Sequence, residues 1–384
     1  MVYSYRNSPR LIPGFLLVVF LGLFSSLPTV AQQRYHRVNL VSDIPGVALR
    51  VDPNLINPWG IAFSPTGPVW IADNNAGVST LYDGKGEPFP AGSPLVVTIP
   101  PPTGGSPPAA PTGIVFNPTL ASASPGFVVS ANGTSGPSVF IFATEDGTIS
   151  GWSPGVDVAN AILAVNNSVN PDPADGAVYK GLAIATRGGA TFIYATNFRA
   201  GFVEMYDSNF TKVKSFTGPN IPAGFAPFGI QTINGHLYVT FAKQNEVRHD
   251  DLAGPGRGVV DVFDTDGSFD REFASGGSLN SPWGLALAPA AGFGKFSDTL
   301  LIGNFGDGRI NAFEDETRGF LGQLQDELGT PLAINGLWGL KFGNGGLAGK
   351  KTRLLFTAGI ADEKHGLFGV IRPARKDDPE DDEE

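Results

Sequence analysis

Apolar and polar residues alternate in short runs along the chain, and one such run occurs six times. Each copy begins with a turn-forming pair, continues with a glycine and ends in an alternating apolar stretch that suits a strand. The glycines of successive copies lie 48 to 68 residues apart. The copies are found at residues 57–63, 110–116, 179–184, 226–230, 281–287 and 336–342.

Further strand-like runs follow each copy. Second strands are expected at 69–72, 127–130, 192–195, 237–240, 299–302 and 353–356. Third strands are expected at 78–83, 139–144, 202–207, 259–264, 309–314 and 367–372. Turns rich in Asp, Asn and Gly then lead to fourth strands, for example at 95–99, 162–165, 212–216 and 271–273. Four antiparallel strands in six repeats predict an all-β fold, a six-bladed β-propeller.

The ring is expected to close through the N-terminal part of the propeller. The sixth repeat ends at Pro373 without a fourth strand, while residues 36–41 form a strand-like run that has no repeat of its own. We therefore predict that this run supplies the missing outer strand, so that no long edge is left unpaired. The propeller would occupy residues 32–373 as a single domain.

The recurring glycine and the aromatic residue before it have an architectural explanation. Inner strands converge on a crowded channel, where a glycine allows close approach. We expect the rings of Trp59, Trp283 and Trp338 to wedge between adjacent blades. The alternative is that they form a stacking platform for a sugar or an aromatic ligand.

Composition and charge extend the picture to the two ends of the chain. Residues 1–31 have the basic start, apolar run and small residues of a secretory signal peptide, which predicts a secreted, periplasmic or cell-surface protein. Residues 374–384 are expected to be an acidic disordered tail. The net charge of −10 and the lack of a basic stripe argue against nucleic acid as a partner. The chain has no cysteine, which excludes thiol chemistry.

One mouth of the channel gathers the candidate ligand residues. Loops from second to third strands, and from fourth strands to the next blade, share this end, which we call the first mouth. The alternative for each Asn there is a structural role in a strand-ending turn, where its side chain caps the strand. The candidate ligand-binding residues are Asn74, Asn132, Lys180, Asn197, Arg199, Lys243 and Asn304. Ca²⁺ is the cofactor that amide and carboxylate oxygens would favour, with Asp73 as its carboxylate ligand.

The same mouth holds the candidates for catalysis. His249 and His365 lie on loops of alternate blades, where they could meet as acid and base or as metal ligands. Together with Asp73 and Lys243 they are the catalytic candidates. The structural alternative is that both histidines are ordinary exposed loop residues. No P-loop, G-x-S-x-G or H-E-x-x-H motif occurs in the sequence.

The repeated pattern around residues 57–75 and 281–305 resembles the NHL-type six-bladed propellers. Residues 35–373 are similar to an uncharacterised family of exported bacterial propellers, whose members often carry a PEP-CTERM sorting tail. The acidic end of this chain departs from that tail. The related gluconolactonase-like and streptogramin-lyase patterns need a Glu at the start of an inner strand and a close His pair, respectively, and this sequence has neither at the matching positions.

The sequence therefore favours an exported propeller that binds a small molecule, a glycan or a protein at the first mouth. We expect a monomer without an integral membrane segment after signal cleavage. The alternative is a metal-assisted hydrolase, similar to a lactonase, or a lyase acting at the same mouth.

Overall fold

The computed structural model describes residues 1–4, 9, 34–172 and 174–374 of the chain. The contacts between residues divide the chain into two compact units, residues 1–32 and residues 33–384. The second unit contains the strands. Most of the predicted signal peptide and nearly all of the predicted acidic tail lie outside the described residues. Within the described parts of the chain, no helix has the length and apolar character that a membrane span requires.

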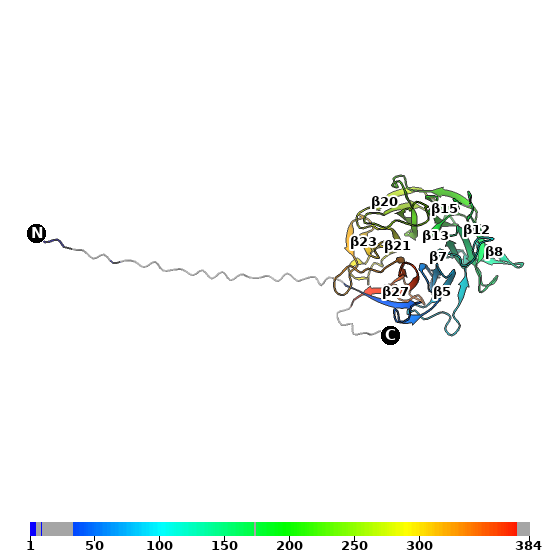
Figure 1. Cartoon of the computed structure of the whole chain (residues 1–384), viewed down its shortest axis with the longest axis horizontal. Helices are drawn as coiled ribbons and strands as arrows, with labels where there is room; N and C mark the ends of the chain where they lie inside the picture. Colours follow the sequence, from blue (N-terminus) through cyan, green and yellow to red (C-terminus); the bar gives the residue numbers. More distant parts are fainter. Residues whose placement is uncertain (5–8, 10–33, 173, 375–384) are drawn as a thin grey trace. The chain divides into compact units, whose positions relative to one another are not determined.

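Six antiparallel sheets are arranged around a central axis, as the repeats predict (Figure 1). The first three blades contain β3 (Pro58–Ala62), β4 (Val69–Asp73), β5 (Val78–Tyr82) and β6 (Val96–Thr98); β7 (Pro111–Phe116), β10 (Phe140–Thr144), β11 (Thr148–Trp152) and β12 (Ile162–Asn166); and β13 (Tyr179–Arg187), β14 (Ala190–Asn197), β15 (Phe202–Tyr206) and β16 (Lys212–Phe216). The next two contain β17 (Phe225–Ile233), β18 (His236–Lys243), β19 (Val259–Asp264) and β20 (Phe269–Ser275); and β21 (Pro282–Leu287), β22 (Thr299–Asn304), β23 (Ile310–Glu314) and β24 (Phe320–Gln323).

The sixth blade closes the ring with the N-terminal strand, which confirms the prediction. It contains β25 (Leu337–Phe342), β26 (Leu354–Ile360) and β27 (His365–Pro373), and its outer strand is β1 (Tyr35–Ser42). β1 runs antiparallel to β27, with Tyr35 opposite Pro373. A short strand that the sequence did not predict, β2 (Arg50–Val51), adds to β1 in parallel.

The glycines of the inner strands stand where neighbouring backbones leave no room for a side chain. A Cβ on Gly113 would lie 2.3 Å from the backbone nitrogen of Leu182, and one on Gly229 would lie 2.1 Å from the carbonyl oxygen of Trp283. Real Cβ atoms do not approach other atoms so closely. The repeated glycine is therefore explained by the packing of six inner strands, in agreement with the sequence.

Blade 2 differs from the predicted strand assignment. The run at 127–130 is not the second strand of the blade, because β8 (Val128–Ala131) pairs only with β9 (Thr134–Pro137) in a separate hairpin. The run at 139–144 is the second strand, β10, and the third strand is β11. An additional hairpin, β8–β9, is inserted after the inner strand. The prediction therefore assigned a strand of this hairpin as the second strand and β10 as the third. Two 3-10 helices also occur among the described residues, Pro118–Ala121 and Gly294–Phe296.

Candidate ligand-binding mouth

Five of the six residues that precede an inner-strand glycine gather at the channel axis near the first mouth, whereas the hydroxyl of Thr112 bonds to the backbone of neighbouring strands. Pairing between the first and second strands shifts register in every blade, and a bulge of this kind bends a strand and redirects a side chain. Four of the six positions hold aromatic residues, one holds threonine and one holds lysine. In chain order they are Trp59, Thr112, Lys180, Phe228, Trp283 and Trp338.

The aromatic residues close the channel just below the first mouth. Trp59 stacks on Trp338 with ring centroids 3.5 Å apart, and Trp283 meets both rings edge-on. Phe305 stacks on the other side of Trp338 with a centroid distance of 4.0 Å. We call this group the aromatic plug; its rings are Trp59, Phe198, Phe228, Trp283, Phe305 and Trp338.

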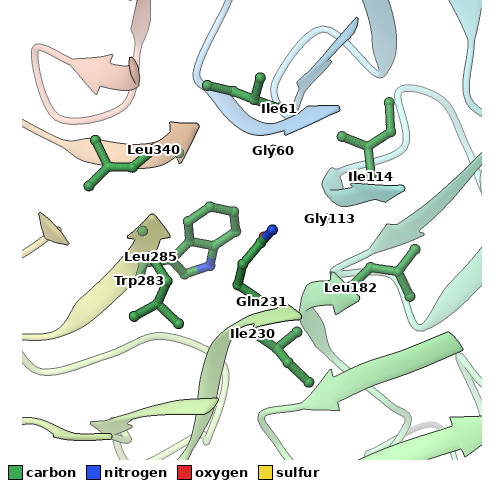
Figure 2. Close-up of a pocket in the computed structure, with 12 residues that line it drawn as sticks. Gly60, Ile61, Gly113, Ile114, Leu182, Ile230, Gln231, Trp283, Leu285 and Leu340 are labelled. Atoms are coloured by element: carbon green, nitrogen blue, oxygen red, sulfur yellow. The ribbon is translucent and has the colours of Figure 1, made fainter. Parts of the chain in front are cut away.

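The plug corrects the expected place of the tryptophans, which was between adjacent blades. Trp59 of blade 1 stacks on Trp338 of the neighbouring blade 6, but it also meets Trp283 of blade 5, which is not its neighbour in the ring, so the three rings lie over the axis. Trp59 and Trp338 are each only 1% exposed, so their faces are not open to stack on a ligand. A small cavity of about 30 Å³, roughly the size of one water molecule, lies against Trp283 and the inner-strand glycines (Figure 2).

Lys180 places a buried positive charge beside the plug. Its ammonium lies 5.3 Å from the ring centroid of Trp59. The same Nζ donates a hydrogen bond to Oε1 of Glu145, and it lies 3.2 Å from Oδ1 of Asp250. Burial opposes the charged form, but the two carboxylates outweigh it and raise the pKa of Lys180 above its ordinary value. Lys180 therefore remains protonated at neutral pH.

His249 joins this group from the long loop between β18 and β19. Its Nδ1 lies 2.8 Å from Oδ1 of Asp250, and its side chain is 36% exposed. The hydrogen bond from His249, followed by the charge of Lys180, lowers the pKa of Asp250. We call Glu145, Lys180, His249 and Asp250 the mouth cluster.

Two more carboxyl groups lie within electrostatic range of the mouth cluster. Burial raises the pKa of both Asp251 and Glu363, and the negative charge of Glu145 raises that of Glu363 further. Oε2 of Glu363 accepts a hydrogen bond of 3.0 Å from the amide of Asn57. Four carboxyl groups thus surround one lysine, and their excess negative charge is the main electrostatic feature of the first mouth.

The loop that carries Glu363 has an unusual backbone. Ala361, Asp362 and Glu363 have φ values of 54°, 55° and 62°, a left-handed conformation that costs energy for residues other than glycine. Asn57, which holds the Glu363 side chain, also has a positive φ, 49°. Strained residues of the two loops therefore meet at the mouth, and the surrounding contacts must offset their cost.

Three of the mouth donors could share one metal ion. Glu145, His249 and Asp250 each offer a ligand atom, and these atoms all lie within 4.8 Å of one another. Two carboxylates and an imidazole form a donor set that suits a divalent cation. Ca²⁺ would need further oxygen ligands beyond these three residues.

Of the ligand candidates named from the sequence, Lys180 and Asn74 belong to this region. The Asn74 amide donates a hydrogen bond of 2.9 Å to Oε2 of Glu145. Asn197 and Asn304 instead bond to nearby parts of the propeller: Asn197 donates to Glu204 of β15 at 3.2 Å, and Asn304 donates to the carbonyl of Ser278, in the loop before β21, at 2.8 Å. These two contacts agree with the strand-ending role that was the alternative for each Asn.

The remaining ligand candidates fall into different settings. Arg199 donates a hydrogen bond of 2.9 Å to the carbonyl of Gly176 in the loop before β13. Lys243 ends β18 and is partly buried, and no hydrogen bond or ion pair of its side chain occurs among the described residues. Asn132 lies in the turn of the β8–β9 hairpin, with φ 51°, so its expected place in the ring of second-strand ends is wrong.

Asp73 and His365, the other catalytic candidates, lie apart from the mouth cluster. Asp73 is fully buried in blade 1, where it accepts a hydrogen bond of 2.8 Å from Thr80, and burial raises its pKa well above the ordinary value. The Asp73 carboxyl group therefore has no exposed surface at the mouth. Nδ1 of His365 lies 2.6 Å from Asp43, and no contact between His365 and His249 occurs in the described structure.

Glu145 is the functional candidate that the sequence did not reveal. It follows β10 directly, one residue beyond Thr144, which is the register equivalent of Asp73, Asn197 and Asn304 at the ends of other second strands. With residues 127–130 as the second strand, the sequence pattern places Glu145 in the turn after the third strand. The apolar run Phe140–Thr144 followed by Glu145-Asp146-Gly147 is the signal that could have identified it.

Comparison with known proteins gives this chain relatives. No model of a known protein family matches it. It is 34% identical over 344 residues to the uncharacterized protein R648 of Acanthamoeba polyphaga mimivirus, covering 86% of this chain and 78% of that protein. The uncharacterized protein L690 of the same virus is 33% identical over 309 residues, which cover 78% of this chain and 77% of L690.

The chain belongs to the family of these mimivirus proteins. Both relatives are viral, and they give no support to the expected resemblance to a bacterial exported family with a PEP-CTERM tail. Membership in the family assigns no ligand or reaction, so the site has to be interpreted from its own geometry.

Solved structures show the same fold at low sequence identity. Virginiamycin B lyase from Staphylococcus aureus, in a catalytically inactive form with quinupristin, has a TM-score of 0.50 at 14% identity, and the match covers 89% of this chain and 99% of the lyase. The soluble aldose sugar dehydrogenase from Escherichia coli has a TM-score of 0.51 at 12% identity, covering 88% of this chain and 100% of the dehydrogenase. These likenesses concern the propeller fold alone.

Proposed function

We propose that the chain is a binding protein whose ligand at the first mouth is a divalent cation. The observation that carries the proposal is the meeting of Glu145, His249 and Asp250, whose ligand atoms lie within 4.8 Å of one another. Lys180 compensates only part of the surrounding negative charge. A divalent cation would relieve the remaining repulsion, which also affects Asp251 and Glu363.

The plug supports binding at the surface of the mouth rather than passage through the channel. Trp59, Trp283 and Trp338 meet in the middle of the ring directly beside Lys180. A bound ion would therefore be held by loops of blades 2 and 4 above a rigid floor. Rigid support of this kind lowers the cost of ordering the ligands on binding.

The test is thermal unfolding after removal of metals with EDTA, followed by addition of Ca²⁺, Mg²⁺, Mn²⁺ or Zn²⁺ alone. An ion present at 100 times its Kd raises the free energy of unfolding by about 2.7 kcal/mol, which should raise Tm by several degrees. Glu145→Gln and His249→Ala should abolish the rise. Glu246→Gln, on the same loop as His249 but exposed and outside the mouth cluster, should retain it.

No rise in Tm with any of the four ions would overturn the proposal. A rise that persists in both Glu145→Gln and His249→Ala would place the ion elsewhere and overturn the assignment of the site. Isothermal titration of the same variants checks that the Tm change reports binding at this mouth.

A second candidate is acid–base catalysis at the same mouth, as in a hydrolase or lyase. The hydrogen bond between His249 and Asp250 favours it, because a carboxylate orients an imidazole for proton transfer. A panel of lactones and esters should then show conversion that His249→Gln reduces by about 100-fold or more, with Glu246→Gln unaffected. Absence of conversion with every probe would count against a hydrolase of this kind.

Export remains part of the proposal through residues 1–31, whose sequence has the features of a signal peptide. Fusion of residues 1–34 to a reporter enzyme that is active only outside the cytoplasm tests it. Reporter activity is expected with the natural sequence and should be lost when Leu16 and Leu17 are changed to Asp.

A further inference from the structure

A second cavity opens at the opposite end of the propeller, where the inner strands finish. It has a volume of about 450 Å³ and is lined by inner-strand residues of blades 1, 2, 3, 4 and 6. We call it the funnel. Most of its lining is apolar, including Phe63, Val115, Ala183 and Ile184. Both the volume and the apolar walls are typical of sites for small organic molecules.

The funnel ends inside the channel and does not reach the first mouth. Ile114, Leu182 and Gln231 line both the funnel and the 30 Å³ cavity beside Trp283. Figure 2 shows the Gln231 side chain pointing into the centre of the channel next to Trp283. The aromatic plug therefore separates the floor of the funnel from the mouth cluster.

Lys341 is the charged side chain of the funnel. It lies on the inner strand β25, which packs against β3, β21, β22 and β26, and none of these four strands carries an ionisable residue. Its ammonium lies 5.3 Å from the ring centroid of Phe63. Across the described residues, Lys341 has neither an ion pair nor a side-chain hydrogen bond. Burial alone lowers its pKa to about 8.

We propose that the funnel binds a small amphipathic carboxylate, with its head group on Lys341 and its hydrocarbon body on the apolar inner-strand residues. A carboxylate would give the partly buried ammonium the counter-ion that the protein does not supply. The apolar body would cover Val115, Ala183 and Ile184, and removing this surface from water favours binding. Gln231 at the floor offers an amide as a further polar contact.

The binding should depend on pH through Lys341. At pH 7 the amine is mostly protonated, because its pKa is about 8, and a bound anion raises that pKa further. As pH rises above 8 the free protein loses the positive charge, and the affinity for a carboxylate falls. A carboxylic acid is ionised throughout this range, so the change reports the lysine.

Isothermal titration with decanoate tests the proposal, with decanol as the uncharged probe and acetate as the probe without a hydrocarbon body. At pH 7 decanoate should bind at least about 10-fold more tightly than decanol, and acetate should show no measurable binding. Lys341→Met should weaken decanoate binding by about 10-fold or more, and Lys341→Arg should keep it within about 3-fold. Lys85→Met, which alters an exposed lysine, should change nothing.

Equal affinity for decanoate and decanol, or decanoate binding that Lys341→Met leaves intact, would overturn the proposal. The unsubstituted protein provides an independent measurement if Lys341→Met does not fold. Its affinity for decanoate should fall from pH 7 to pH 9.5, and a pH-independent affinity would also contradict a head group held by Lys341. The outcome is separate from the cation proposal, because no residue is shared between the funnel and the mouth cluster.

Discussion

Lys180 carries a buried charge at a position that four other blades fill with an aromatic ring. Its side chain is 3% exposed, and its two carboxylate partners differ, since Glu145 is 13% exposed and Asp250 is 60% exposed. A buried ion pair adds little net stability by itself, but the loss of one partner leaves the other charge without compensation. The pair therefore fixes the arrangement of the mouth more than it strengthens the fold.

Substitution of Lys180 tests this role. Lys180→Met should lower the free energy of unfolding at pH 7 by about 3 kcal/mol, because Glu145 loses its counter-ion. Urea unfolding provides the measurement, and Lys85→Met should change stability by less than about 0.5 kcal/mol. If the mouth binds a divalent cation, the ion should restore part of the loss. Equal stability of Lys180→Met and the natural protein would contradict the assigned role.

Asp261 predicts a pH dependence that belongs to the core of blade 4. Burial, followed by the charge of Glu272 opposite it on β20, raises the pKa of Asp261 to about 7. Between the ordinary pKa and pH 7 the folded protein keeps a proton that the unfolded chain has lost. The contribution of this residue to stability therefore falls as pH rises through that window.

The variant Asp261→Asn removes this titration. We compare the unfolding free energy of this variant with that of the natural protein. The difference in favour of the variant should be about 2 kcal/mol larger at pH 8 than at pH 5. Asp264→Asn, on the same strand but exposed, should show a change of less than about 0.5 kcal/mol at both pH values. Urea titrations at the two pH values measure both variants. If the difference in unfolding free energy between Asp261→Asn and the natural protein is the same at pH 5 and pH 8, the raised pKa of Asp261 is contradicted.

At the scale of the element, β1 holds the ring together across a large sequence separation. Tyr35 at its start is 1% exposed, packs its ring against Phe293 at a centroid distance of 5.0 Å, and donates a hydrogen bond of 3.0 Å to the Phe293 carbonyl. Phe293 belongs to the loop between β21 and β22. The closing strand β1 is the outer strand of blade 6, and through Tyr35 it also contacts blade 5.

Truncation of Tyr35 should consequently affect the whole ring. Tyr35→Ala is expected to cost about 3 to 5 kcal/mol of stability, since a large buried ring is removed. Val128→Ala, in the β8–β9 hairpin, should cost less than about 0.5 kcal/mol because Val128 is half exposed. Chemical unfolding followed by circular dichroism compares the two. Similar losses in both variants would contradict the closing role of β1.

Elements were predictable where the local pattern and the tertiary pairing agree. In blades 3 and 4 the runs at 192–195 and 237–240 became β14 and β18, since each follows its inner strand through a short turn. In blade 2 the run at 127–130 has the same apolar character but pairs with β9. Sequence periodicity identifies a strand without identifying its partner, and the misassignment of this blade concealed Glu145.

At the scale of the whole molecule, the aromatic plug divides the channel into two ends with opposite chemistry. The first mouth combines several carboxyl groups with one lysine, while the funnel presents one lysine among apolar residues. Trp283 and the rings stacked around it lie between them. The two ends should therefore act as separate sites.

A double-mutant cycle tests that separation. The changes in unfolding free energy caused by Glu145→Gln and Lys341→Met should add in the double variant to within about 0.5 kcal/mol, as expected for sites without shared contacts. Urea unfolding of the four proteins gives the coupling. A coupling energy above about 1 kcal/mol would show that the plug transmits changes between the two ends.

The sequence by itself determined the number of blades, the inner-strand glycines and the closing strand. The first two follow from a short-range pattern that each repeat carries, since every inner-strand glycine packs against the next inner strand. The closing strand follows from the strand that the sixth repeat lacks and the N-terminal run that has no repeat of its own. Only the tertiary structure decided which side chains meet on the axis. Lys180, Glu145 and Asp250 come from three different blades or loops, and Lys341 lies in the funnel only because six inner strands converge. Such contacts depend on how the ring closes, and no local pattern records that geometry.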